Sequence, residues 1–433
     1  ASAGELTRIA LKKAAYVIVL AEGLGMKNSF SDVTTIKTLM LISTKLNSVK
    51  KPNIVAEIVD TDKLSIANIV SDMQHPIVSS GQIISKMIVQ CARYPGYSAV
   101  YSELFSIKKT TIQVAKVNHK EGDTFGEIAC RVSNGTAIGI SWIKTENGKS
   151  RRVTILNPEP DFDLAEEDEI IVIRDINIPL EINSKNHASS SIENQAEKSG
   201  SQLSVRPNIK RVLMFSISPN IGEIIKEMNE HTMERLEIVL ACKNASDNCS
   251  FLLNQLGERQ DDVKDIFATQ PLIEPMEFDL EGTWSLESLN LNEFDAIFIL
   301  ADESELRVDA DSRTVLLLVL LKSLRDRNKD ANFPPVVAEI LDQQTLDLLE
   351  DAPINDAVIS TEFLSNLLLQ VARNPFLETI YRELLNAGGV EMGFRPVERY
   401  SNIDNEVKHC DIVSAAQNLN ETVIGYRIFK GSN

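Results

Sequence analysis

Acidic side chains stand at or just after the ends of short apolar segments in two distant parts of the chain. In chain order they are Glu22, Glu57, Asp60, Asp302, Glu303, Glu339 and Asp342. Ca²⁺ prefers oxygen ligands, about six to eight of them, and carboxylates supply the charge. If the apolar segments are parallel strands, their carboxyl ends share the sheet edge at which open α/β sheets bind ligands. The residue types therefore predict Ca²⁺ ligands at this edge in each part. The alternative is that these acids cap the helices that follow.

The two parts are copies of one sequence unit. The matching segments are Ala15–Glu22 with Asp295–Asp302, Ala56–Asp60 with Ala338–Asp342, and Gln90–Pro95 with Gln370–Pro375. They are separated by 280, 282 and 280 residues. Three matches in the same order at nearly one spacing identify a tandem duplication.

Each copy predicts strands that alternate with helices. Two of the expected strands, Tyr16–Leu20 and Ile297–Leu300, are continuous apolar runs. Ile54–Val59, Arg211–Ser216 and Val336–Leu341 are also expected to be strands. Helical spacing covers Thr34–Leu46 and Ser312–Leu324, with Asp311 or Ser312 as the N-cap of the second helix. This alternation predicts an α/β fold with a doubly wound parallel sheet in each copy.

A helix, a proline and a second helix follow in both copies. The first helices are Gln82–Arg93 and Glu362–Arg373, and the second ones are Tyr97–Phe105 and Leu377–Leu385. Proline cannot continue the first helix, so an elbow is expected. The apolar faces of the first helices hold Ile83, Ile84, Met87 and Ile88 in one copy and Leu364, Leu367, Leu368 and Val371 in the other. We expect these faces to form a subunit interface; the alternative is that each packs on its own sheet.

Short β segments separated by turns follow the first elbow. They are Thr111–Val117, Thr136–Ile140, Arg152–Leu156 and Glu169–Ile173, and they predict a small α+β lobe. Val423–Tyr426 repeats the pattern of Ala137–Ile140, but the chain ends before the rest of a second small lobe. Between the copies, 183–205 is polar and almost without large apolar residues, which predicts a linker.

Composition narrows the classes of function. The net charge of −18 over 433 residues repels nucleic acid, so none is expected as a partner. The longest apolar run, Thr314–Leu321, is far below the roughly 20 residues needed to cross a bilayer, and no secretory signal opens the chain. We therefore expect a soluble piece. The five cysteines form no CxxC pair and the five histidines are scattered, which favours a reducing compartment and no zinc site.

An α/β lobe, an elbow and a small β-rich lobe, present twice, resemble the tandem RCK modules of ligand-gated potassium and calcium channels. Individual motifs resemble the CASTOR/POLLUX ion channels more closely. These are Phe294–Ser304 (FDAIFILADES) with Asp311–Arg313, Glu339–Asp342, Gln90–Gly96 (QCARYPG), Asn157–Pro158 with Glu167–Ile173, and Val423–Arg427 (VIGYR).

The resemblance implies two RCK modules, each with a Rossmann-like lobe, crossover helices and a small lobe. The implied ranges are 1–107 and 108–180 for the two lobes of the first module, 181–208 for the linker, and 209–388 and 389–433 for the second module. In this family roughly two further βα units are expected before Leu11. The first module is therefore expected to be incomplete at its start, and the last small lobe at its end.

The resemblance also implies a role that is not enzymatic. The chain would be the cytosolic gating ring of a membrane channel, covalently linked to the pore and assembled as a homotetramer through the crossover helices. Ca²⁺ would bind at the strand ends, as in RCK modules that this chain resembles, and would change the angle between lobes.

Two other classes of function stay open. One is a nucleotide-regulated RCK/TrkA-type subunit of a potassium-uptake system, and the other is a nicotinamide enzyme. A dinucleotide site needs several glycines, whereas the turn after Arg211–Ser216 offers only Gly222 and contains Pro219. Neither NAD nor ATP is therefore expected, and no catalytic His, Lys or Ser stands near a glycine-rich loop.

Overall fold

The structure, a computed structural model, forms two compact units. The first, here the α/β unit, comprises Ala1–Ser102, Arg206–Glu378 and Leu385–Ala387; the second, the small-lobe unit, comprises Glu103–Val205, Thr379–Leu384 and Gly388–Asn433. The residues described are 3–9, 11–21, 28–46, 52–71, 75–107, 110–119, 122–146, 149–183, 208–232, 234–258, 270–280, 289–302, 307–327, 333–349, 354–386, 390–400 and 409–428. Most of the predicted linker, 184–207, lies outside them.

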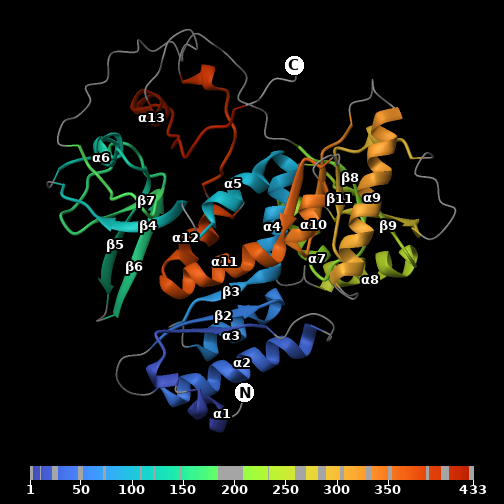
Figure 1. The fold of residues 1–433 in the computed structure, drawn as a ribbon, viewed down its shortest axis with the longest axis horizontal. Helices are drawn as coiled ribbons and strands as arrows, with labels where there is room; N and C mark the ends of the chain where they lie inside the picture. The colour runs from blue at the N-terminus through green and yellow to red at the C-terminus, as the bar shows by residue number, and fades with distance from the viewer. Residues whose placement is uncertain are drawn as a thin grey trace. The chain divides into compact units, whose positions relative to one another are not determined.

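The second copy contributes a six-stranded parallel sheet to the α/β unit, in the order β10-β9-β8-β11-β12-β13 (Figure 1). Its strands are β8 (Arg211–Phe215), β9 (Glu237–Cys242), β10 (Leu272–Glu277), β11 (Ala296–Ile299), β12 (Val336–Ile340) and β13 (Asp356–Ile359). Every residue of β11 and β12 is buried, as expected for apolar strands that are covered on both faces. The predicted α/β fold class is confirmed.

The first copy contributes a shorter parallel sheet, β1-β2-β3. Its strands are β1 (Tyr16–Val19), β2 (Asn53–Ile58) and β3 (Ile77–Ser79), and they pair in the same order as β11, β12 and β13. Among the described residues β1 has no partner on its other side, where β11 pairs with β8. This difference explains why β1 is partly exposed and β11 is buried.

The helices of the α/β unit are α1 (Ala3–Arg8), α2 (Asn28–Lys45), α3 (Leu64–Val70), α4 (Ser80–Arg93), α5 (Tyr97–Leu104), α7 (Ile221–His231), α8 (Ala245–Glu258), α9 (Arg307–Arg327), α10 (Gln343–Leu346) and α11 (Ser360–Arg373). Most of α12 (Leu377–Leu384) belongs to the small-lobe unit. Both elbows fall where proline predicted them. Within the described part of the chain, no helix combines the length and the apolarity that a membrane crossing requires.

The small-lobe unit holds an antiparallel sheet in the order β4-β7-β5-β6. Its elements are β4 (Thr110–Lys116), β5 (Thr136–Glu146), β6 (Lys149–Leu156), β7 (Glu169–Asp175), α6 (Phe125–Arg131) and α13 (His409–Gln417). Phe125, Ile140 and Ile170 lie in its core. The strand-like pattern at 423–426 was misleading, because this segment forms no strand.

One aspartate in each copy ties a helix to the strand end beside it. Asp32 of α2 accepts hydrogen bonds from the backbone N–H groups of Val59 and Asp60 at 3.0 and 2.9 Å. Asp311 of α9 accepts from Leu341 and Asp342 at 2.9 Å each. Both carboxylates are buried, so each satisfies two N–H groups that strand pairing leaves open. The predicted N-cap role of Asp311 is therefore wrong: α9 begins at Arg307, four residues earlier.

We expect Asp311→Ala to lower the free energy of unfolding by about 2–4 kcal/mol, because it leaves two buried N–H donors unpaired. Urea unfolding measures the loss, and hydrogen exchange should localise it to Leu341 and Asp342. Asp309→Ala, at an exposed position on the same helix, is the control and should cost less than about 1 kcal/mol. Equal losses in the two variants would contradict this role of Asp311.

Candidate functional site

The predicted Ca²⁺ ligands on the equivalent strands β2 and β12 hold the neighbouring backbone. The Oε2 atom of Glu57 on β2 accepts a hydrogen bond from the N–H of Ala21 at 3.2 Å. Glu339 on β12, only 1% exposed, accepts one from Ala301 at the same distance. Burial raises the pKa of Glu57, while hydrogen bonds from Ser80 and Ala21 oppose the rise. The duplication therefore preserves a carboxylate that holds the end of the adjacent strand.

The aspartates that follow these strands are N-caps. Asp60 Oδ1 accepts from the N–H of Asp62 at 3.1 Å, at the start of the 3₁₀ turn Thr61–Lys63. Asp342 Oδ1 accepts from the N–H of Gln344 at 3.0 Å, at the start of α10. Both positions therefore perform the capping role that was the alternative to metal binding.

A metal site at either edge needs more than these residues. Among the described residues, no three His, Cys, Asp or Glu side chains gather closely enough to hold a metal ion. Asp302 is described, but the predicted ligands Glu22 and Glu303 lie outside the described residues. A Ca²⁺ site at either edge would therefore need ligands in addition to the described carboxylates, and Ca²⁺ binding stays a prediction.

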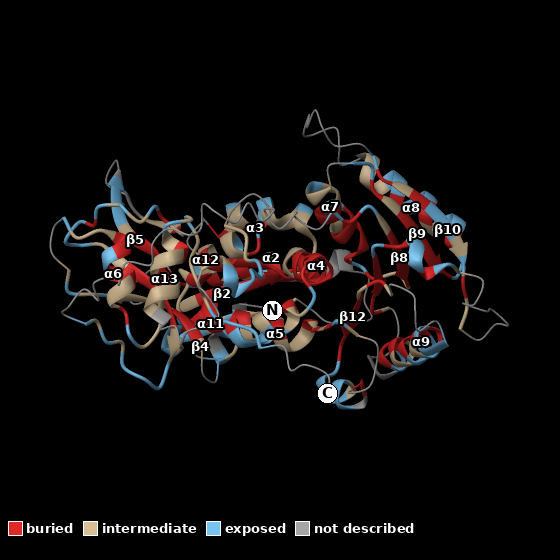
Figure 2. Cartoon of the chain, turned by 90° about the horizontal axis from the view of Figure 1, so that it is seen from above, coloured by how far each residue is buried: buried red, intermediate tan, exposed pale blue. Residues whose placement is uncertain are grey.

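Within the α/β unit, helices α4 and α11 pack between the first and the second copy. Helix α4 of the first copy packs on α7, β12 and β13 of the second, while α11 of the second copy packs on β1 and β2 of the first. Met87, Ile88, Leu367 and Val371 are buried there, and Figure 2 shows α4 coloured almost wholly as buried. The prediction that these faces join different subunits is therefore wrong, because they are covered within one chain. The sequence missed this partner because the duplication gives each helix two equivalent sheets to cover.

Three polar and steric contacts fix this pairing. Asp356 of β13, 1% exposed, accepts from the N–H groups of Gly96 and Ser98 at 2.6 and 2.7 Å, and so caps α5 of the other copy. Asn53 Nδ2 donates to the carbonyl of Arg373 at 3.4 Å. A Cβ at Gly81 would lie 2.7 Å from both Asn220 Oδ1 of the second copy and the Val59 carbonyl oxygen of the first, so glycine allows the close approach of α4 to both. The sequence position of Asp356 carried no signal of its role.

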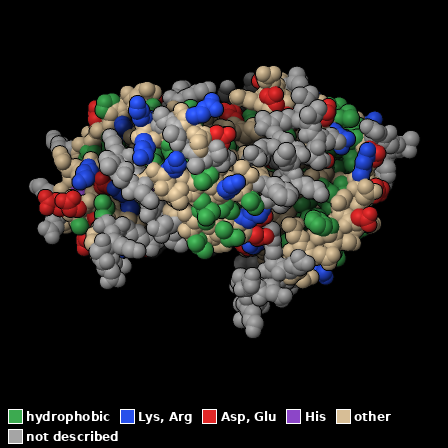
Figure 3. All heavy atoms as spheres, turned by 90° about the horizontal axis from the view of Figure 1, so that it is seen from below, with side chains coloured by type: hydrophobic (Ala, Val, Ile, Leu, Met, Phe, Trp, Pro, Cys, Tyr) green, Lys and Arg blue, Asp and Glu red, His purple; other side chains and the backbone are tan. Residues whose placement is uncertain are grey.

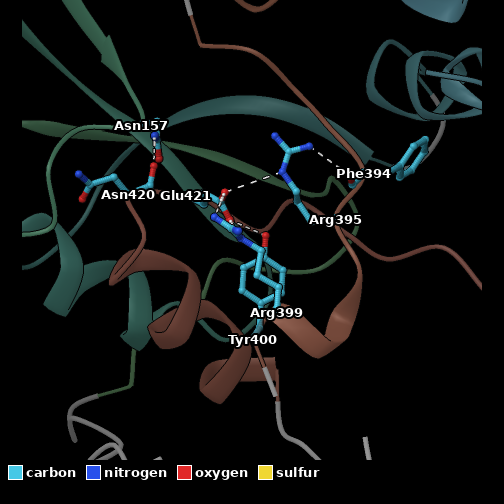
Figure 4. Close-up of polar contacts among 7 residues, drawn as sticks. All are labelled: Asn157, Phe394, Arg395, Arg399, Tyr400, Asn420 and Glu421. Atoms are coloured by element: carbon cyan, nitrogen blue, oxygen red, sulfur yellow. Dashed lines mark hydrogen bonds and ion pairs between the residues drawn. The ribbon is translucent and has the colours of Figure 1, made fainter. Parts of the chain in front are cut away.

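In the small-lobe unit, Asn157 holds the segment that follows α13. Its Nδ2 donates to the carbonyl of Asn420 at 2.8 Å (Figure 4). Its Oδ1 accepts from Thr422 Oγ1 at 2.6 Å. Asn157 has φ = +47°, a conformation that asparagine tolerates better than most residues. This gives a structural reason for the Asn157–Pro158 motif.

Glu421 anchors the same segment of the second small lobe. It accepts from the Tyr400 hydroxyl at 2.5 Å and from Arg399 Nη2 at 3.1 Å, and Arg395 Nε lies 3.9 Å away (Figure 4). Burial raises the pKa of Tyr400, and the Glu421 carboxylate adds to the rise. Side-chain bonds of this kind take the place of strand pairing at the end of the chain.

Comparison with known proteins agrees with this architecture. Residues 81–190 match the family model described as Castor and Pollux, part of voltage-gated ion channel. The ion channel CASTOR of Lotus japonicus is 25% identical over 98% of this chain and 51% of its own length. The probable ion channel POLLUX of Oryza sativa subsp. japonica is 24% identical over 98% and 45%. The resemblance to CASTOR and POLLUX is confirmed. The chain spans about half the length of these CASTOR and POLLUX relatives.

A solved structure shares the fold. The human SLO3 gating ring aligns with a TM-score of 0.58 at 15% identity, covering 89% of this chain and 76% of that one. At this identity the match concerns the fold alone, and the fold is that of RCK gating-ring modules. The CASTOR and POLLUX relatives are named as ion channels.

We expect Asp356→Asn to destabilise the pairing of the copies by about 1.5–3 kcal/mol, because it removes charge-assisted bonds to two N–H groups. Faster hydrogen exchange at Gly96 and Ser98 would report the loss directly. Asp347→Asn, an exposed aspartate at the end of α10, provides the matched control. The cap has no such role if exchange at Gly96 and Ser98 is the same in both variants.

Proposed function

We propose that the chain is the cytosolic regulatory part of a cation channel and forms a gating ring with other copies of itself. The crossed packing of α4 and α11 carries this proposal. Each crossover helix covers the sheet of the other copy, so the two α/β lobes move as a linked pair. A ligand that favours one arrangement of this pair shifts the whole assembly toward it. In the whole protein a covalent link would pass this change to the pore.

The surfaces proposed to join neighbouring chains are two outer apolar faces of the α/β unit, one on each copy. The first consists of Val33 and Met40 on α2 with Ile66 and Ile69 on α3, and the second of Leu316, Val319 and Leu320 on α9 with Leu346 on α10. Ile69 is 74% exposed and Val319 is 55% exposed. Figure 3 shows hydrophobic side chains gathered on the face seen from below, where α2 and α3 lie in Figure 1. Exposed apolar side chains that gather on one face mark candidate interaction sites.

Another molecule of the same chain is the partner that best fits these faces. Helices α2 and α9 occupy equivalent places in the two copies, as Asp32 and Asp311 establish. One chain therefore presents two related apolar faces, and repeated heterologous contacts between such faces can close into a ring. The apolar faces of α4 and α11 are not available for this contact, because Met87, Ile88, Leu367 and Val371 are buried within the chain. A homotetramer is the proposed closed form.

The start of α7 offers little to the nucleotide-regulated alternative. In a dinucleotide site the pyrophosphate lies at the N-terminus of the helix after the first strand, which in the second copy is α7. Here Gly81 and Ser85 of α4 lie against Asn220, immediately before α7, with Ser85 Oγ 3.5 Å from the Asn220 carbonyl. A pyrophosphate would have to displace this packing.

The free cysteines suit the reducing compartment that a cytosolic location implies.

Self-association tests the ring. Light scattering of the purified chain is expected to give a mass well above that of a monomer, and Leu316→Glu with Val319→Glu should shift the equilibrium toward monomer at least tenfold, because each buries a charge in the contact. Phe251→Glu changes an exposed apolar residue outside both faces and should have no effect. A strict monomer at every protein concentration would refute the ring.

We propose Ca²⁺, bound at the strand ends, as the ligand that shifts this pair. Titration calorimetry tests this proposal. Glu339→Gln keeps an oxygen that can accept from Ala301 but removes the charge, so it should weaken Ca²⁺ binding at least tenfold. Asp247→Asn, at an exposed position on α8, is the control and should bind like the wild type. If wild type and Glu339→Gln give equal heats, Glu339 is not a Ca²⁺ ligand.

A further inference from the structure

A polar cavity lies between α4 of the first copy and α7 of the second, within the α/β unit. Its volume is about 150 Å³, and it is lined by Gln82, Ser85, Lys86, Glu223, Lys226, Glu227, Glu230 and Asn386. A single bridging water needs only about 10–15 Å³ of such space. Pockets for drug-sized ligands begin at about 300 Å³. The cavity therefore suits a small polar molecule and is too small for a nucleotide.

Lys86 supplies a buried positive charge to this cavity. The residue is 7% exposed, and its Nζ donates to Asn386 Oδ1 at 3.4 Å. Within the described part of the chain it forms no ion pair. An ammonium carries three N–H donors, so two remain for a ligand. Glu230 of the same cavity interacts with Lys86 through space but forms no hydrogen bond with it. A buried cation that is not held by a direct carboxylate contact is costly, so an anionic group that reaches Lys86 would be stabilised there.

The opposite wall of the cavity, formed by α7, carries three carboxylates and one lysine, Lys226. Glu223, Glu227 and Glu230 recur every three to four residues along α7 and so share one face of the helix. Glu227 is buried and pairs with His231 Nε2 at 3.2 Å. Burial raises the pKa of Glu230, and the Glu227 carboxylate adds to the rise. The carboxylates and Lys86 thus face one cavity, but Lys86 closes no ion pair with them among the described residues.

This arrangement selects by charge. A divalent cation would be repelled by Lys86, and a simple anion would be repelled by the carboxylates of α7. A molecule that carries both charges satisfies both walls. We propose that the cavity binds a small zwitterion of the amino-acid class, with its carboxylate on Lys86 and its ammonium on Glu227 and Glu230.

Such a ligand bridges the two copies. Its carboxylate binds a helix of the first copy and its ammonium binds a helix of the second, so binding stabilises the packing of α4 on α7 by mass action. The inference concerns the chain itself and does not depend on the channel function. It gives the linked pair of lobes a second input, separate from the strand ends.

Thermal shift and titration calorimetry on the whole 433-residue chain test this site with glycine, β-alanine and γ-aminobutyrate, which differ in charge separation. Acetate and methylammonium, the two halves of the ligand, serve as controls. At least one zwitterion should raise the melting temperature, and neither half should do so at the same concentration. Lys86→Gln and Glu230→Gln should each weaken binding at least tenfold. Lys37→Gln, on the exposed side of α2, should leave it unchanged.

The two variants keep the test decisive. Lys86 is buried, so its replacement also changes stability, whereas Glu230 lies at the exposed rim of the cavity and its variant should melt like the wild type without ligand. The proposal is overturned if no zwitterion shifts the melting temperature. It is equally overturned if acetate or methylammonium alone gives the same shift, or if Glu230→Gln binds as tightly as the wild type.

Discussion

The structure depends on the burial of each crossover helix against the sheet of the other copy. Met87 and Ile88 of α4, and Leu367 and Val371 of α11, are almost completely buried there. Burying one such side chain is worth about 1.5–3 kcal/mol, so these contacts outweigh any single polar tie in the unit. Neither α/β lobe can cover its apolar surface alone. Each lobe therefore buries part of its apolar surface only through its contact with the other.

Two kinds of polar contact have different roles in this pair. Asp32 with Glu57, and Asp311 with Glu339, occur in both copies and organise each strand end from within. They fix the shape of each lobe. Asp356 has no equivalent, since Pro76 stands at the matching position of the first copy. Its bonds to Gly96 and Ser98 therefore give the pairing a direction that the duplication alone would not.

The same carboxylates explain why acidic residues at strand ends are ambiguous. A carboxylate beside a strand end meets unpaired backbone N–H groups, and it can bind these or a cation. In the described residues these carboxylates accept hydrogen bonds from backbone N–H groups. Other charged side chains of the unit line the cavity between α4 and α7. There the first copy contributes Lys86, and the second contributes Glu223, Glu227 and Glu230 together with Lys226.

Four features could be predicted from the sequence alone: the duplication, the α/β class, both elbows and the resemblance to the CASTOR and POLLUX channels. These features follow from periodicity, from the fixed φ of proline and from motifs, all of which are local. The tertiary structure alone decided which sheet each crossover helix covers, which acids bind backbone, and that Lys86 faces α7. Duplicated sheets present equivalent apolar surfaces, so local pattern cannot choose between them. Only the fit of particular contacts, such as Gly81 against Asn220 and Asp356 at the start of α5, makes that choice.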